Sequence, residues 1–119
     1  MDAKEFDEIV ERMLARTRSV LVSKAGEYAT DDRLHNFKVS GATQGITPMQ
    51  ALAGMMAKHT VSIYDMIRKG KPYSRGLWEE KLTDHINYLI LLRGLIEEEE
   101  QKLAVAIKTT ENTESPQNA

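Results

Sequence analysis

The chain has 119 residues, of which 41% are apolar and 29% charged, and its net charge is −2. This balance indicates one soluble globular domain, offers no dense basic surface for a nucleic acid, and contains no run near the ~18 apolar residues of a membrane span. Because the chain has no cysteine, disulfides, zinc–thiolate centres and cysteine nucleophiles are excluded. The charged N-terminus lacks the apolar core of a secretory signal, so we expect a cytoplasmic protein.

The first predicted helix covers residues 3–26. Apolar side chains from Phe6 to Leu21 recur at spacings of three and four, which is the helical period, and Gly26 is expected to end the helix. The polar stretch that follows predicts either a long loop or a loop with a short helix around residues 34–40. Long loops in small domains are often functional.

The second helix has the clearest start in the sequence. Thr47, Pro48 and Gln50 fit the N-cap, N1 and N3 positions of a capping box. Gly70 is expected to end the helix after Lys69, since glycine is favoured just past a helix C-terminus.

The third helix is predicted from about residue 76 to 107, and its second half projects beyond what the other helices can cover. We expect that half to pack on another subunit. Residues 108–119 lack large apolar side chains and are predicted to be a disordered tail, which leaves 1–107 as a single helical domain. No segment alternates as a strand does, so the expected fold is an all-α bundle of three or four helices, completed by oligomerisation.

A polar stripe runs through the apolar part of this third helix. Glu80, Asp84 and Asn87 stand at i, i+4 and i+7, with Tyr88 beside them, so they share one side of the helix. The stripe is either the solvent face of an amphipathic helix or one wall of a polar site, because the surrounding "INYLILL" is apolar nearly all round.

A second stripe on the preceding helix gives the same choice. Lys58, Ser62 and Asp65 recur at helical spacing and His59 lies next to them. In one interpretation Lys58 points to solvent and His59 is an ordinary half-buried histidine. In the other, the two stripes face each other, and Lys58 pairs with Asp84 or Glu80 or meets a ligand phosphate.

The polar loop supplies further groups suited to a nucleotide. Lysine and arginine bind phosphate, while asparagine and tyrosine can hydrogen-bond a base or a ribose. These side chains either form an ordinary surface loop or close over a ligand together with Phe37. They are Lys24, Tyr28, Arg33, His35, Asn36 and Lys38.

Two tracts within residues 24–97 stand out: "EEKLTDHINYLILL", and "NF" followed by "GITPMQALAGMMAKHTVSIYDM". With them, this part of the chain resembles the MazG-like all-α NTP pyrophosphohydrolase superfamily, including small phage and prophage members of unknown function. The resemblance implies two neighbouring helices whose four carboxylates hold magnesium against a triphosphate.

The chain departs from that acidic pattern at several positions. Asp84 fits the aspartate of the second acidic motif, but Lys81 stands where a glutamate is expected, with Glu80 one residue away. The preceding helix reads "KHTVS" at 58–62, where an acidic pair is expected. Magnesium requires oxygen ligands in near-octahedral order, so the departure favours retained nucleotide binding and lost cleavage.

The resulting hypothesis is a homo-oligomeric nucleotide-binding protein that captures a nucleotide or nucleotide-derived molecule without hydrolysing it, with no cofactor favoured. In a phage setting it would sequester a host nucleotide immune signal in the host cytosol, an anti-defence role. The expected ligand-binding residues are Lys24, Tyr28, Arg33, His35, Asn36, Lys38, Lys58, His59, Ser62, Asp84, Asn87 and Tyr88.

Two alternatives stay open. In the first, Asp84 and Glu80 act catalytically and, with Asp65, hold Mg²⁺ in an NTP pyrophosphohydrolase, helped by a second subunit or by Glu27 and the Asp31–Asp32 pair. In the second, the chain is a helical dimerisation or interaction protein. None of the interpretations involves a nucleic acid or a membrane.

Overall fold

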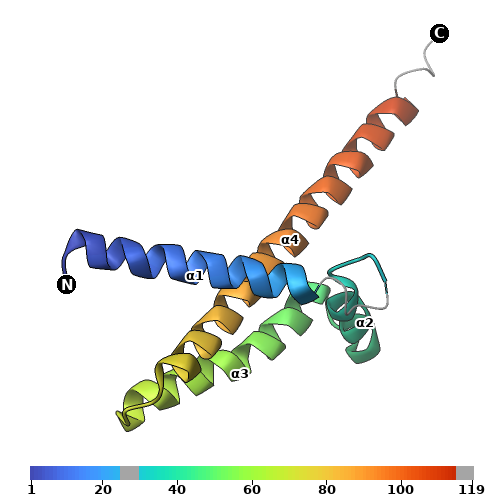
Figure 1. The fold of residues 1–119 in the computed structure, drawn as a ribbon. Helices are drawn as coiled ribbons and strands as arrows, with labels where there is room; N and C mark the ends of the chain where they lie inside the picture. Colours follow the sequence, from blue (N-terminus) through green and yellow to red (C-terminus); the bar gives the residue numbers. More distant parts are fainter. Residues whose placement is uncertain (25–29, 115–119) are drawn as a thin grey trace.

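The computed structural model describes residues 1–24 and 30–114, and within them every regular element is an α-helix (Figure 1). The helices are α1 (Ala3–Lys24), α2 (His35–Gln44), α3 (Pro48–Lys69) and α4 (Arg75–Glu114). The all-α prediction is therefore confirmed. Of the two alternatives left open for the polar stretch, a long loop or a loop with a short helix around residues 34–40, the structure has the helix, α2. The predicted stop at Gly26 lies outside the described residues.

The start and end of α3 are as predicted. The Thr47 hydroxyl accepts from the Gln50 N–H at 3.1 Å, and the Gln50 side chain accepts from the Thr47 N–H at 2.9 Å. Gly70 ends the helix with φ 64° and donates its N–H to the Met66 carbonyl. The left-handed φ is one that glycine adopts without a steric penalty.

The corner between α2 and α3 is tight. A Cβ atom built on Gly41 would lie 2.8 Å from the Ile46 carbonyl oxygen, so only glycine lets the end of α2 approach the start of α3 this closely. Gly45 ends α2 with φ 71°. This corner packs the end of α2 against the start of α3.

The last helix corrects the predicted boundary. α4 continues to Glu114, beyond the end expected near Ile107. The sequence contains no glycine or proline between Gly94 and Pro116, so nothing breaks the backbone hydrogen bonds of the helix, and polar residues in it are tolerated because they face water. Residues 108–114 of the expected disordered tail are thus helical.

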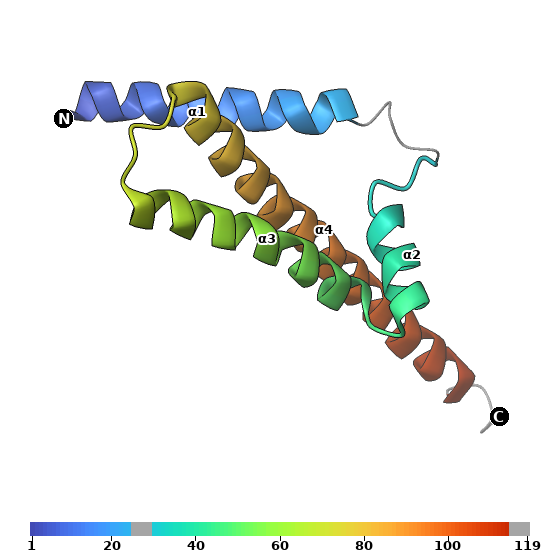
Figure 2. The ribbon, with the colours of Figure 1, turned by 90° about the horizontal axis from the view of Figure 1, so that it is seen from below.

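The core lies where α2, α3 and α4 meet. Figures 1 and 2 show α3 and α4 as an antiparallel hairpin, with α2 against the N-terminal end of α3. The buried core side chains are Leu34, Phe37, Leu52 and Leu95. Leu52 is fully buried, so truncating it to alanine would cost about 2–5 kcal/mol.

α1 crosses α4 near the start of that helix (Figure 2). The Glu79 carboxylate on α4 pairs with Arg12 of α1 at 3.1 Å and with Arg75 at 3.3 Å. Desolvation alone would raise the pKa of Glu79, but hydrogen bonds from Arg75 and Arg12 outweigh it and lower that pKa. Several apolar side chains of α1 stay exposed, among them Phe6 by 57% and Leu14 by 61%.

The molecule is elongated, with principal extents of 73 × 37 × 29 Å. The length follows from α4, whose 40 residues span about 60 Å at ~1.5 Å per residue. In the described part of the chain, no helix combines the length and apolar character needed to cross a membrane.

Candidate ligand-binding site

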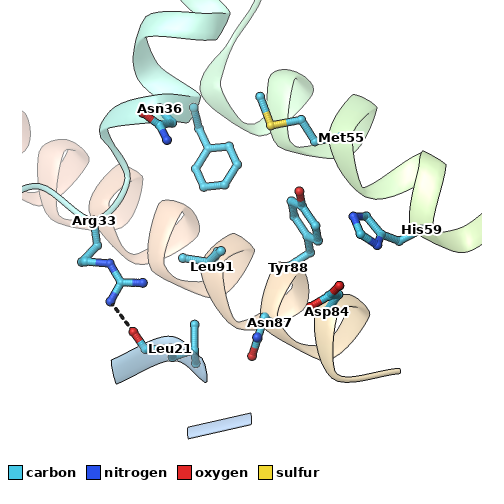
Figure 3. A pocket seen from close by; sticks show the side chains of 10 residues that line it. Leu21, Arg33, Asn36, Met55, His59, Asp84, Asn87, Tyr88 and Leu91 are labelled. Atoms are coloured by element: carbon cyan, nitrogen blue, oxygen red, sulfur yellow. Dashed lines mark hydrogen bonds between the residues drawn. The ribbon is translucent and has the colours of Figure 1, made fainter. Parts of the chain in front are cut away.

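A cavity of about 230 Å³ lies between α2, α3, α4 and the C-terminal end of α1 (Figure 3). Each of these helices contributes side chains, and so does the segment before α2. The wall combines apolar and aromatic side chains with polar ones. The lining residues are Leu21, Arg33, Asn36, Phe37, Met55, His59, Asp84, Asn87, Tyr88 and Leu91.

The polar stripe of α4 forms one wall of this cavity. Asp84 and Asn87 both line it, and Leu91 continues the same side of the helix one turn further on. Asn87 is only 7% exposed. This part of the stripe is therefore turned inward, whereas Glu80, one turn before Asp84, is exposed and does not line the cavity.

The facing wall comes from α3 through Met55 and His59. The rings of His59 and Tyr88 lie 4.9 Å apart at an interplanar angle of 44°, so the two helices meet through a tilted ring contact. Lys58 is exposed, and within the described residues it forms no ion pair with Asp84 or Glu80. Of the two interpretations left open for Lys58, the structure therefore agrees with the one in which it points to solvent. His59 is turned inward, which places Lys58, about 100° away round the helix, outside the cavity.

The segment before α2 brings Arg33 to the cavity. Its Nη1 atom donates to the Leu21 carbonyl oxygen at 2.8 Å (Figure 3). That carbonyl belongs to the last described turn of α1. Arg33 therefore joins the end of α1 to the rim of the cavity.

α2 adds an exposed and a buried residue. Asn36 is exposed at the rim, and Phe37 is buried and packs edge-on against Tyr88 with centroids 6.5 Å apart. The aromatic pair forms an apolar part of the wall beside the polar groups of α4.

Lys38 lies outside the cavity lining, in a cluster of its own. Its Nζ atom lies 2.6 Å from Asp32 Oδ2 and 2.9 Å from Glu98 Oε2. The hydrogen bond to Asp32, followed by that to Glu98, raises the pKa of Lys38, and the Lys38 hydrogen bond, followed by the Leu34 N–H, lowers the pKa of Asp32. The cluster fastens the segment that carries Arg33 to α4.

Several polar groups of the cavity have no partner within the described residues. Oδ1 of Asn87 and Nδ1 of His59 are buried without a hydrogen bond, and no ion pair or hydrogen bond holds Asp84 in that part of the structure. Leaving a buried polar group unpaired costs about 1–3 kcal/mol. Natural structures keep few such groups, and an unfilled ligand site is one reason to keep them.

Six of the predicted ligand-binding residues thus meet at one cavity: Arg33, Asn36, His59, Asp84, Asn87 and Tyr88. His35, Lys38, Lys58 and Ser62 do not line it. Tyr28 and Glu27 lie outside the described residues, as does the side chain of Lys24.

The residues proposed for magnesium in the alternative interpretation are not brought together. Asp65 lies 3.5 Å from Arg68 in an ion pair, and Glu80 is exposed. In residues 1–24 and 30–114, no group of three His, Cys, Asp or Glu side chains is placed to hold a metal ion.

Three lining residues were not predicted as part of a site: Leu21, Met55 and Leu91. Met55 stands at i−4 from His59, on the same side of its helix. Leu91 stands at i+7 from Asp84 and i+4 from Asn87, so the spacing that singled out the stripe also contained it. Leu21 reaches the cavity only because α1 ends there, which no local pattern indicates.

Comparison with protein-family models, with curated proteins and with solved structures finds no match for this chain. The class that the described residues define is an all-α arrangement of four helices with a polar and aromatic cavity.

Proposed function

We propose that the cavity binds a nucleotide or a nucleotide-derived small molecule and that the protein captures this ligand without hydrolysing it. The observation that carries the proposal is the set of polar groups on the cavity wall that lack protein partners within the described residues. Asn87 is the central one, since it is 7% exposed and its Oδ1 has no hydrogen bond.

The composition of the wall supports a nucleobase inside the cavity. Aromatic rings stack on bases at about 1–3 kcal/mol per base, and Phe37 and Tyr88 supply such rings. Amide and carboxylate groups can pair with the edge of a base, and Asn87 and Asp84 supply such groups on the cavity wall. Rotation of the Asn87 amide would present either its oxygen or its NH₂ group to the ligand.

The size of the cavity supports the same assignment. Its 230 Å³ is below the ~300–1,000 Å³ of pockets that enclose a whole drug-sized ligand, so a base or nucleoside fits and phosphates extend outside. Arg33 at the rim carries the planar guanidinium that suits phosphate.

Capture without cleavage is supported by the charges on the wall. Asp84 is the only carboxylate among the described lining residues, whereas two-metal phosphate hydrolysis uses several. A protein of this kind acts by lowering the free concentration of its ligand. Sequestration of a host nucleotide immune signal is the role we assign, on the strength of the resemblance to phage proteins.

The test is isothermal titration of the purified full chain with ATP, GTP, UTP, AMP, cyclic AMP and cyclic dinucleotides, each with EDTA and with Mg²⁺. We expect at least one of these nucleotides to bind with EDTA present and to be recovered intact by chromatography. Inorganic phosphate and ribose 5-phosphate serve as controls for binding through phosphate alone. Absence of binding throughout the panel, or turnover with Mg²⁺, would overturn the proposal.

A further inference from the structure

The α3–α4 hairpin has a second side, which faces away from the cavity. His59 on α3 and Asp84 on α4 mark the cavity side. About 150° further round each helix, at ~100° per residue, lie Tyr64 on α3 and Leu82 and Leu89 on α4. The two helices lie side by side and antiparallel (Figure 1). The residues about 150° from the cavity on each helix therefore lie on the same side of the hairpin, opposite the cavity.

This back face, as we call it, is apolar and exposed. Tyr64 is 62% exposed, Ile67 61%, Leu89 48% and Leu82 38%. Single exposed apolar residues are common, but a contiguous set marks an interaction surface. The six residues that define the back face, none of them charged, are Ala53, Ala57, Tyr64, Ile67, Leu82 and Leu89.

The spacing along this face is that of helices that pack lengthwise on other helices. On α4, Leu82, Leu89, Ile96 and Leu103 recur every seven residues. On α3, uncharged residues occupy positions 53, 57, 60, 64 and 67, alternating steps of four and three. A seven-residue repeat keeps one stripe facing a partner helix along its length.

The exposed surface area of the chain is larger than that of a compact monomer of the same mass. The chain exposes 8850 Å², roughly a third more than the ~6,500 Å² expected for a folded monomer of its mass. Its radius of gyration is 19.9 Å, against ~13.5 Å for a compact domain of this length. The excess is larger than the ~800 Å² that each partner buries in a stable interface.

We infer that a second copy of this chain covers the back face, so that two α3–α4 hairpins form a four-helix bundle across a two-fold axis. A two-fold interface uses the same patch on both partners, and the six residues of the back face can pack on the same residues of a second copy. Two helical hairpins packed face to face are a common way to build a four-helix bundle.

The same arrangement gives the end of α4 a neighbour. Residues 99–112 are all exposed, and Leu103 is exposed by 63%. A helix with no tertiary packing is marginal in water. A second α4 along the repeat of Leu82, Leu89, Ile96 and Leu103 supplies that packing.

The dimer leaves the cavity open, because the back face lies on the other side of the hairpin. Dimer formation and ligand binding therefore depend on different residues and can fail separately. A monomer that still binds a nucleotide would overturn this inference and leave the proposed function standing.

The experiment is light scattering after size exclusion, with sedimentation equilibrium over the micromolar range. We expect the full chain to have twice its chain mass of 13.5 kDa and Leu89→Glu to have that mass once, with unchanged helical circular dichroism. Val39→Glu on α2 is the matched control, since Val39 is 49% exposed and Leu89 48%. That control should remain dimeric.

Cross-linking gives a second, independent measurement. The chain has no cysteine, so Leu89→Cys introduces one thiol, and a short bis-maleimide should convert it to a covalent dimer while Val39→Cys remains monomeric on a denaturing gel. A wild-type monomer, a dimer that survives Leu89→Glu, or an assembly broken by Leu14→Glu on α1 instead would each overturn the inference.

Discussion

Lys38 of α2 contacts α4 and Asn87 belongs to α4, yet the surroundings of the two side chains differ in one respect. Lys38 contacts two carboxylates, at 2.6 Å and 2.9 Å. Asn87 is more deeply buried, and its amide forms no hydrogen bond within the described part of the chain. The Lys38 cluster, formed by Asp32, Lys38 and Glu98, is complete without a ligand, whereas the cavity around Asn87 is not.

The difference separates polar groups that hold the fold from polar groups available for binding. Paired charges stabilise the segment that carries them, even if exposed pairs contribute only about 0.2–1 kcal/mol each. An unpaired buried amide lowers stability. Such locally unfavourable groups are expected at functional sites, where they serve binding or catalysis and the rest of the fold offsets their cost.

The largest expected effect comes from Asn87→Leu. Losing the amide should weaken nucleotide binding by roughly 10–100-fold, the equivalent of about 1.4–2.7 kcal/mol. The free chain should not lose stability, and should gain about 1 kcal/mol, because a buried amide without a partner is replaced by an apolar group of similar size. Titration calorimetry and urea unfolding measure the two effects. Lower stability with unchanged binding would show that Asn87 is structural.

A smaller effect is expected from Lys38→Met. The substitution leaves Asp32 and Glu98 without their shared cation, so the free energy of unfolding should fall by about 1 kcal/mol. Binding should weaken only about two- to threefold, through looser placement of Arg33. Lys71→Met, at an exposed lysine with no ion pair in the described residues, is the matched control and should leave both unchanged. A loss of binding as large as that of Asn87→Leu would mean that Lys38 contacts the ligand.

A smaller effect is expected in how the difference in free energy of unfolding between wild type and Lys38→Met depends on pH. The pKa shifts of Asp32 and Lys38 determine its direction. The pKa of Asp32 is lowered by Lys38, so its contribution is present above the ordinary value near 3.8 and is lost as pH falls through the lowered pKa. The pKa of Lys38 is raised, so its contribution is complete below its ordinary 10.5 and is lost only above it. Urea unfolding of wild type and Lys38→Met should therefore converge in acid below pH ~4. A difference that grows in acid would contradict the assignment.

The smallest expected effect is that of Lys58→Ala. Lys58 adjoins His59 in sequence but is exposed and lies outside the cavity lining. Its removal should change stability by less than about 0.5 kcal/mol and binding by less than about twofold. A tenfold loss in calorimetry would show instead that the ligand's phosphates extend across α3 to Lys58.

Local chemistry explains which parts of the fold were predictable. The limits of α3 follow from Thr47, Gln50 and Gly70, all of which act within one turn of the helix ends. The end of α4 was placed too early, because the sequence around Ile107 loses its apolar residues without gaining a residue that breaks a helix. A change in composition does not end a helix unless a residue such as glycine or proline also disrupts its backbone hydrogen bonds.

In the candidate site, too, the sequence predicted what depends on neighbouring residues of one helix and did not predict what depends on contacts between helices. The stripe through Asp84 and Asn87 was visible as a spacing, but the spacing fits a solvent face equally well. The cavity wall is assigned by contacts from α3, such as that between His59 and Tyr88. Lys38 was predicted to meet a phosphate, and only the packing of α2 on α4 places it at Glu98, 60 residues away.

By itself, then, the sequence determined the helical class, the caps of α3 and the residues that share a side of each helix, since these depend on groups a few positions apart. The tertiary structure decided which of those sides is covered. It turned Asn87 inward and Lys58 outward, engaged Lys38 with two carboxylates, and brought Leu21 to the cavity. Such outcomes depend on contacts between distant segments, because one helical spacing is compatible with burial on any side until another helix packs against it.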